Sequence, residues 1–213
     1  PHSTTYNPAS DMPGTFTYTV MGTAPCTAAS ATVTITESTT PNAGPDASIA
    51  LCSDGAAVDL SSLLTGADPG GTWINTLGNP VPPLFDPTTD PAGTFIYVLS
   101  GTAPCHGASA MVNISLHERP DAGSGTVVHW CADMDAVNLI TELGGTPDAG
   151  GTWTAPDGST LIGLFDPANA ASGPYTYTVT GTSPCASTSS VITVDIDPVP
   201  MPVVDAPITT CSP

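Results

Sequence analysis

The residues best suited to chemistry in this chain are cysteines that recur at a regular spacing. There are six, at Cys26, Cys52, Cys105, Cys131, Cys185 and Cys211. Cysteines bind zinc or form disulfides, but zinc ligands usually come in close pairs, and no Cys-x-x-Cys is present. An even number with one pair per repeat is typical of disulfides made in an oxidising compartment. We therefore expect six structural disulfide cysteines in an exported protein.

Three disulfide connectivities respect this spacing. The first pairs cysteines over the shorter interval, as in Cys26–Cys52, and would join each repeat to the next across a Pro-rich hinge. The second pairs them over the longer interval, Cys52–Cys105 and Cys131–Cys185, and would close each complete repeat on itself. A third scheme joins one repeat to the next through Cys52–Cys185. Ordinary immunoglobulin topology puts the two cysteines of one domain at opposite poles, which argues against the second scheme. A self-contained staple nevertheless stabilises a small domain by about 2–4 kcal/mol, so we favour the second.

Aspartates in loops are the next candidates for chemistry. Sixteen of the 19 acidic residues are aspartates, many beside Gly, Pro or Asn. Calcium takes six to eight hard oxygen ligands and often stiffens junctions between domains. Asp46 and Asp121, in or beside the predicted Pro/Gly-rich hinges that open the repeats at 41–46 and 120–123, are the first candidates. No Asp-x-Asp-x-Asp-Gly loop occurs, and aspartate is also a common turn residue. Calcium is the one cofactor that the sequence suggests.

The remaining residues form no catalytic pattern. The four histidines, His2, His106, His117 and His129, do not recur at equivalent positions. No Gly-x-Ser-x-Gly, His-Glu-x-x-His or Gly-rich phosphate loop is present. We predict no catalytic residues and no enzymatic activity.

One recurring sequence motif shows how the chain is organised into repeats. Gly-Thr-x-Pro-Cys occurs at 22–26, 101–105 and 181–185, and its three cysteines are almost equally spaced. A fixed period of this length, about 80 residues, indicates tandem copies of one small domain. The predicted segments are the C-terminal half of a repeat at 1–40, complete repeats at 41–119 and 120–198, and the opening strand of a further repeat at 199–213.

The two incomplete ends have two interpretations. Either these residues are a window of a longer repeat protein, or successive subunits complete each other by strand donation. The head and tail together lack the counterparts of the Val-Asp-Leu and Gly-Gly-Thr-Trp segments, so they do not add up to a whole sandwich. We favour the window.

Each repeat has the pattern of an all-β domain. Alternating strands are predicted at 15–20, 94–98 and 175–179, with Thr, Val and aromatic residues enriched, and Gly and Pro occur about every 8–12 residues. With 24 prolines and 21 glycines, one helical turn near 60–64 and another near 139–143 is the most we expect. About seven strands in roughly 80 residues predict tandem Ig-like antiparallel β-sandwiches.

The tryptophans have several interpretations. We expect Trp73 and Trp153 to lie in the core between the sheets, the alternative being rings that stack on a ligand. Trp130, which has no aromatic counterpart in the preceding repeat, is expected to cover a domain junction.

The charge of the chain excludes several functions. It carries 19 acidic residues and a single basic one, Arg119, for a formal net charge of −18. Such a chain cannot neutralise phosphates, which excludes nucleic acid and direct docking to anionic lipid. No apolar run long enough to span a bilayer and no signal peptide is present, so we expect no direct membrane insertion.

The order of motifs resembles a known class of repeats. Pro-x-Ala-Gly-x-Asp, Leu-Cys-x-x-Gly, Val-Asp-Leu, Gly-Gly-Thr-Trp, Phe-Asp-Pro, Gly-x-Tyr-x-Tyr-x-Val and Pro-Cys-x-x-x-Ser follow one another along the chain. This order is similar to the Ig-like/PKD-like tandem repeats of large Bacteroidota-type cell-surface adhesin or filament proteins, including gliding-motility-type adhesins exported by the type IX system. The resemblance implies an extracellular or cell-surface location. It carries over no binding residues.

Two functions follow from these expectations. The first is an extracellular structural or adhesive repeat protein that forms a rod or filament on the bacterial cell surface. Its partners would be other copies of itself or flanking repeats of the same long chain, with surface glycans as a further partner. The alternative is a non-catalytic carbohydrate-binding or spacer module array of a secreted enzyme.

Overall fold

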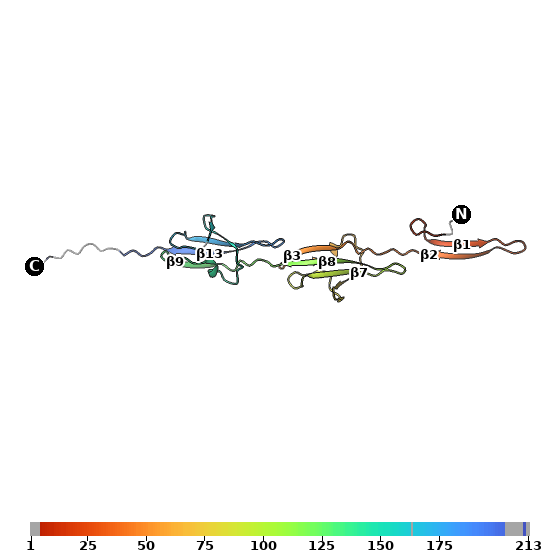
Figure 1. Cartoon of the computed structure of the whole chain (residues 1–213), viewed down its shortest axis with the longest axis horizontal. Coiled ribbons are helices and arrows are strands. Elements are labelled where there is room, and N and C mark those ends of the chain that lie inside the picture. Colours follow the sequence, from red (N-terminus) through yellow and green to blue (C-terminus); the bar gives the residue numbers. More distant parts are fainter. Residues whose placement is uncertain (1–4, 163, 203–210, 212–213) are drawn as a thin grey trace. The chain divides into compact units, whose positions relative to one another are not determined.

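The chain folds into short β-strands joined by turns. The computed structural model describes residues 5–162, 164–202 and 211, and Figure 1 shows its elements in chain order. His2 and most of the predicted strand at 199–213 lie outside these residues. The strands are β1 (Gly14–Val20), β2 (Ala29–Ile35), β3 (Ala47–Cys52), β4 (Val58–Asp59), β5 (Thr72–Asn75), β6 (Leu84–Phe85), β7 (Gly93–Leu99), β8 (Ala108–His117), β9 (Thr126–Cys131), β10 (Thr152–Thr154), β11 (Thr160–Leu161), β12 (Gly173–Val179) and β13 (Thr188–Asp197). Two 3₁₀ turns, η1 (Leu60–Leu63) and η2 (Leu139–Glu142), stand where single helical turns are predicted.

Long antiparallel hairpins lie at the centre of the larger sheets. β12 pairs with β13 in the five-stranded order β11-β10-β12-β13-β9, and β7 pairs with β8 in the four-stranded order β3-β8-β7-β5. Alternation makes this possible, because Tyr175, Tyr177 and Val179 are buried on one face of β12 while the residues between them are only partly buried. The fold is therefore an all-β, Ig-like sandwich.

The opening strand of a repeat closes the sheet in parallel. β9 runs beside β13 from the pair Ile192↔Thr126 to the pair Asp197↔Cys131. Shorter antiparallel pairings also occur: β4 pairs with β6 through Val58↔Phe85, and an isolated bridge joins Val137 and Phe165.

The strands gather into two compact units. Unit 1 comprises Pro1–Ile49, Val58–Phe85 and Gly93–Ile114, and unit 2 comprises Ala50–Ala57, Asp86–Ala92 and Ser115–Pro213. The repeat boundaries expected from the sequence stay a prediction.

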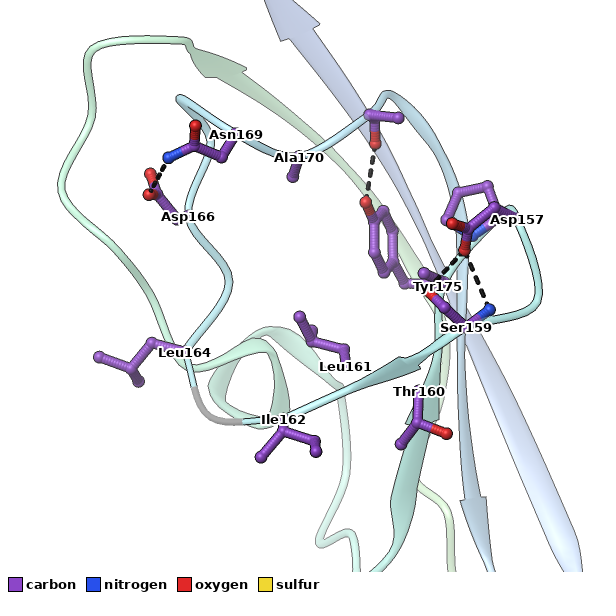
Figure 2. Close-up of a pocket in the computed structure, with 13 residues that line it drawn as sticks. Asp157, Ser159, Thr160, Leu161, Ile162, Leu164, Asp166, Asn169, Ala170 and Tyr175 are labelled. Atoms are coloured by element: carbon purple, nitrogen blue, oxygen red, sulfur yellow. Dashed lines mark hydrogen bonds between the residues drawn. The ribbon is translucent and has the colours of Figure 1, made fainter.

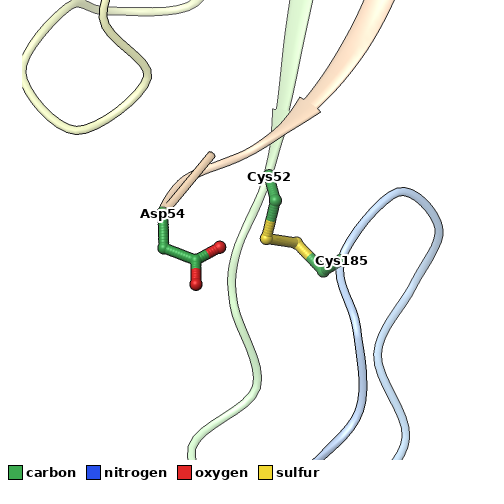
Figure 3. Close-up of side chains that lie close together, drawn as sticks. All are labelled: Cys52, Asp54 and Cys185. Atoms are coloured by element: carbon green, nitrogen blue, oxygen red, sulfur yellow. A yellow bond between two sulfur atoms is a disulfide. The ribbon is translucent and has the colours of Figure 1, made fainter. Parts of the chain in front are cut away.

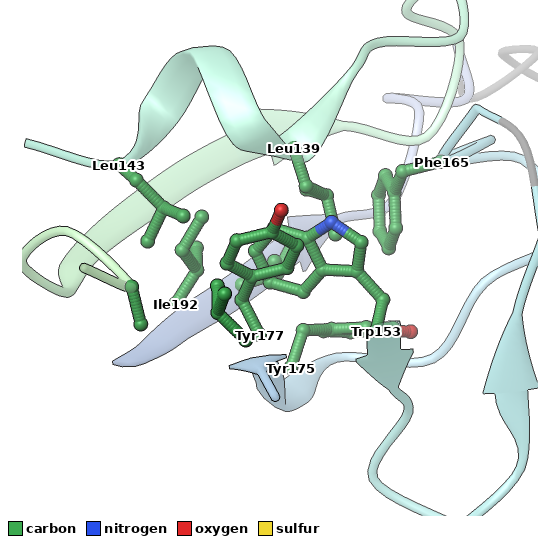
Figure 4. Packing of buried hydrophobic residues seen from close by; sticks show 10 residues of the cluster. Leu139, Leu143, Trp153, Phe165, Tyr175, Tyr177 and Ile192 are labelled. Carbon is green, nitrogen blue, oxygen red and sulfur yellow. The ribbon is translucent and has the colours of Figure 1, made fainter. Parts of the chain in front are cut away.

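Aromatic rings fill the core of unit 2 (Figure 4). Trp153 and Tyr177 are directly opposite each other on β10 and β12, with ring centroids 4.9 Å apart. Phe165 meets Tyr175 edge to face at 5.0 Å. Such ring pairs add about 0.5–1.5 kcal/mol beyond the area that they bury. The prediction that Trp73 and Trp153 are core residues is confirmed, since they are only 4% and 8% exposed.

Trp130 packs against a core, whereas the sequence led us to expect it at a domain junction. Its ring is partly buried against the core of unit 2, 5.4 Å from the ring of Phe165. It extends that core from the edge strand β9.

The two glycines of the Gly-Gly-Thr-Trp segment are required by the backbone conformation and by close packing against a tyrosine ring. Gly150 has φ of +88°, and a Cβ on Gly151 would lie 2.5 Å from the ring of Tyr177. This close approach lets the Tyr177 hydroxyl donate to the Asp148 carbonyl at 2.7 Å and accept from the Gly151 N–H at 2.9 Å. Tyr97 makes the same two bonds in unit 1.

One hairpin exposes residues that are buried elsewhere. β1 and β2 form a two-stranded sheet. Tyr18 is 72% and Val33 61% exposed, whereas their counterparts one repeat later, Tyr97 and Val112, are 6% and 0% exposed. The hairpin therefore carries a core-type face that the described residues leave uncovered.

We expect Tyr177→Phe to lower the stability of unit 2. The change keeps the ring but leaves the Gly151 N–H and the Asp148 carbonyl without their partner, which costs about 1–3 kcal/mol. Urea unfolding followed by tryptophan fluorescence measures the loss. Tyr18→Phe removes the same atom from an exposed ring and should change stability by less than about 0.5 kcal/mol. Equal effects of the two variants would contradict the proposed role of the Tyr177 hydroxyl.

Candidate functional site: the disulfide-linked turn and loop

The Gly-Thr-x-Pro-Cys phrase forms a tight loop at the start of the last strand. In all three copies the bond before proline is cis, and the cysteine N–H donates to the threonine carbonyl at 2.9 Å. This is the arrangement of a type VI turn. A Cβ on Gly181 would lie 2.4 Å from the Cys185 carbonyl oxygen, so only glycine can open the loop. The loop presents Cys185 at one end of β13.

Cys185 is bonded to Cys52, which lies 133 residues away in sequence (Figure 3). Both cysteines are buried, and their Cα atoms are 4.9 Å apart. Cys52 ends β3 and begins a turn in which the Gly55 N–H donates to its carbonyl at 2.9 Å. The bond thus joins the turn after β3 to the loop before β13, and both ends belong to unit 2.

Hydrogen bonds hold the turn in place. The Ser53 N–H donates to the His117 carbonyl at 2.9 Å, and the Arg119 N–H donates to the Ser53 hydroxyl at 3.0 Å. The Nε of Arg119 lies 3.3 Å from a carboxylate oxygen of Asp54. Both charged side chains are about half exposed, so this ion pair contributes at most about 1 kcal/mol. The disulfide is the strongest constraint at the site.

The favoured pairing of cysteines within each repeat is wrong. Cys131 lies opposite Asp197 at the end of β13, whereas Cys185 lies just before the start of that strand at Thr188. The length of the strand separates their levels by about 30 Å, and a disulfide needs Cα atoms within about 7 Å. Because Cys52 is bonded to Cys185, the pairs Cys52–Cys105 and Cys131–Cys185 do not form, nor does Cys26–Cys52. The third scheme is the one observed.

The same residues make a poor metal site. Cys52, Asp54 and Cys185 bring three ligand-type atoms within 4.8 Å of one another. Thiolates bind metals, however, and these two sulfurs are bonded to each other. In the oxidised protein only the Asp54 carboxylate remains as a ligand.

The two predicted calcium residues accept hydrogen bonds from backbone N–H groups. An Asp121 carboxylate oxygen accepts from the Gly123 N–H at 2.7 Å. Its counterpart in the preceding repeat is Asn42, whose amide oxygen accepts from the Gly44 N–H at 3.0 Å. An uncharged side chain therefore accepts the equivalent hydrogen bond. Asp46 accepts from the Met111 N–H at 2.7 Å, and the structure brings neither Asp46 nor Asp121 into a described cluster of three ligand-type residues. Calcium binding stays a prediction.

A pocket of about 380 Å³ opens in unit 2 beside β11 (Figure 2). Several of its polar groups bond to one another or to the backbone: Asn169 donates to Asp166 at 2.7 Å, and the Tyr175 hydroxyl donates to the Ala171 carbonyl at 2.8 Å. Burial is the main cause that raises the pKa of Tyr175. A second hollow of about 520 Å³ lies beside Trp73 in unit 1, where the ring is almost fully buried and offers no face for stacking.

Two other polar pairs lie on the surface. His129 and Asp195 face each other across β9 and β13, 3.6 Å apart and about two-thirds exposed. The Tyr6 hydroxyl donates to Glu37 at 2.5 Å, and desolvation together with that carboxylate raises the pKa of Tyr6 to about 12. Neither pair belongs to a described cluster of catalytic groups.

Comparison with known proteins agrees with the fold. No protein-family model and no curated protein matches the sequence. The three-Ig structure of titin domains I67–I69, an E-to-A mutated variant, matches with a TM-score of 0.51 at 13% identity, covering 87% of this chain and 75% of that one. Extracellular domains 3–5 of Drosophila OTK match with a TM-score of 0.36 at 12% identity, covering 72% and 60%. The titin likeness shows the Ig-like fold and nothing further. Within the described residues, no helix has the length and apolar character needed to cross a membrane.

We expect the disulfide to limit how far the chain extends under force. Residues between Cys52 and Cys185 cannot lengthen while the bond is intact, so reduction should add roughly 450 Å of contour length. Single-molecule pulling at the two termini, with and without reductant, measures this gain. Cys52→Ser should give the longer value without reductant, and Cys26→Ser should behave like the parent. Equal lengths before and after reduction would refute the Cys52–Cys185 bond.

We expect the Asp157 turn to stabilise unit 2 only above the acid range. Ser159 donates its hydroxyl and its N–H to Asp157 at 2.7 and 2.9 Å, which lowers the pKa of that carboxyl below its ordinary 3.8. A lowered folded-state pKa stabilises the fold above the ordinary value, and the gain disappears as the pH falls. Asp157→Asn, which keeps an acceptor oxygen, should lower the melting temperature at pH 7 and have a shrinking effect below about pH 4. Asp135→Asn is the matched exposed control; a pH-independent effect of Asp157→Asn would contradict the assignment.

Proposed function

We propose that this chain is part of an extracellular structural or adhesive repeat protein that forms a rod or filament on the bacterial cell surface. The observation that carries the proposal is the bond between Cys52 and Cys185, two cysteines that the sequence assigns to successive repeats. An enzyme does not need its repeats cross-linked in series. A protein that transmits load or spans a distance gains from it, because the bond shortens the extensible part of the chain.

The disulfide also supports an exported location. Disulfides persist in oxidising compartments and are rare in the cytosol. A formal net charge of −18 with a single basic residue favours a soluble surface that resists non-specific adhesion between chains.

The uncovered face of the β1–β2 hairpin supports continuation of the array. Tyr18, Val20 and Val33 occupy positions whose counterparts are buried in the next repeat, yet each is more than half exposed. Core-type residues are stable in water only when something covers them. A further half-repeat, with the Gly-Gly-Thr-Trp segment that covers these positions elsewhere, is the natural cover.

The placement of the aromatic rings favours this function over a carbohydrate-binding array. Trp73, Trp153, Phe165 and Tyr177 are buried and pack against one another or against neighbouring rings. Recognition of sugars by stacking needs exposed rings, and the repeats use these rings for their own stability.

Electron microscopy of material released from the cell surface should show rods or filaments. Antibodies against the sequence of residues 120–198 should decorate them at regular intervals, because each array presents the same epitope repeatedly. The protein should not be retained on polysaccharide beads at physiological salt.

The matched control is the Cys52→Ser variant expressed in the same cells. It should leave decoration unchanged while making the rods more flexible. Isolated compact particles that are retained on polysaccharide beads would overturn the proposal and favour the carbohydrate-binding alternative.

A further inference from the structure

Cys105 has the same surroundings as the bonded Cys185. The Cys105 thiol donates to the Ser38 carbonyl at 3.1 Å. The Sγ of Cys185, which has no proton, lies 3.2 Å from the His117 carbonyl oxygen. Ser38 and His117 are one repeat apart and occupy equivalent positions before their hinges. Cys105 is thus positioned as Cys185 is, but it is free.

Cys131 likewise has the surroundings of the bonded Cys52. Each cysteine carbonyl accepts from a turn N–H, that of Gly55 at 2.9 Å for Cys52 and that of Met134 at 3.1 Å for Cys131. The residue after each cysteine is anchored to the end of the last strand of its repeat, and the Ala132 N–H donates to the Asp197 carbonyl at 3.0 Å. Cys52 is buried, whereas Cys131 is free and exposed.

We propose that Cys105 and Cys131 are halves of further disulfides in one continuing series, a series that rests on the proposed repeat function. The observed bond joins the turn cysteine of one repeat to the loop cysteine of the next. By the same rule, Cys105 bonds to the turn cysteine of the repeat before it, and Cys131 bonds to the loop cysteine of the repeat after its own.

The partners that this rule gives to Cys105 and Cys131 are neither Cys52 nor Cys185, which are bonded to each other. Counting one period back from Cys52 or one period on from Cys185 leads outside the 213 residues. The partner is therefore a cysteine of a flanking repeat in the same polypeptide, or Cys211 and Cys26 of a second copy, which are of turn and loop type respectively.

The chemistry of each bond is thiol–disulfide exchange. Two thiols lose two protons and two electrons, one S–S bond forms, and a disulfide oxidant such as oxidised glutathione is reduced to two thiols. The fixed turn and loop hold each sulfur in place before its partner arrives, as they do for Cys52 and Cys185.

Mass spectrometry of native material tests the series. The protein from its own source is alkylated with N-ethylmaleimide before disruption and then digested, without reduction, by a protease that cleaves before aspartate. Aspartates separate all six cysteines, so each falls on its own peptide. The Cys52–Cys185 peptide is the internal control for preserved disulfides.

The expected result is Cys105 linked to a turn-type peptide and Cys131 linked to a loop-type peptide. A partner that is absent from this sequence assigns the bond to a flanking repeat, and a Cys211 or Cys26 peptide assigns it to a second copy. Alkylated Cys105 and Cys131, a loop-to-loop link or a Cys105–Cys131 link would each overturn the series. If Cys105 and Cys131 are free thiols in material that still forms filaments, the disulfide series is refuted and the proposed function stands. If the expected links are found in isolated particles, the filament is refuted and the disulfide series stands.

Discussion

The parallel pairing of β9 with β13 decides where every cysteine of a repeat lies. It brings Cys131 to the level of Asp197, while the loop before β13 holds Cys185 at the other end of that long strand. A rise of about 3.3 Å per residue makes that separation far too long for a disulfide. Cys131 and Cys185, which the sequence assigns to one repeat, therefore cannot bond to each other. Cys185 instead bonds to Cys52, which the sequence assigns to the preceding repeat.

The core of each repeat shows why such a link is useful. A domain of about 80 residues buries a smaller fraction of its surface than a larger domain does, and it is only marginally stable by itself. Aromatic side chains pack densely in the core, where Trp153 and Tyr177 form a cross-strand pair. The Tyr177 hydroxyl also hydrogen-bonds to the Gly151 N–H and the Asp148 carbonyl. The long loop closed by Cys52–Cys185 adds stability by restricting the unfolded chain, about 2–5 kcal/mol for native disulfides of small secreted domains. Local packing and the covalent link thus stabilise the fold at two different length scales.

Much of this was predictable from the residues. Period-two alternation located β7 and β12, the Gly-Gly-Thr-Trp segment located the core tryptophans, and prolines limited the helices to η1 and η2. The disulfide pairing was predicted wrongly. The stability of a single small domain favours a bond within each repeat, but the order of the strands places the two cysteines of a repeat at opposite ends of its last strand. The calcium expectation at Asp121 depended on aspartate in a loop, and alignment with Asn42 shows a position that needs an acceptor oxygen for Gly123 and no charge. Close approaches such as that of Gly151 to Tyr177 depend on tertiary contact, which no local pattern encodes.

Comparison of equivalent positions in the repeats shows which residues near the disulfide recur and which are replaced. Arg119 and Asp54 form the one ion pair described at the Cys52 turn, yet the position of Arg119 is occupied by Thr40 one repeat earlier. The glycine that opens the loop, the proline and the cysteine recur in all three copies, and so do the cis peptide and the turn hydrogen bond. An exposed ion pair contributes little and is easily replaced, whereas a disulfide needs both sulfurs placed within a fraction of an ångström. At this site, the elements that recur are therefore those that position the sulfur atom.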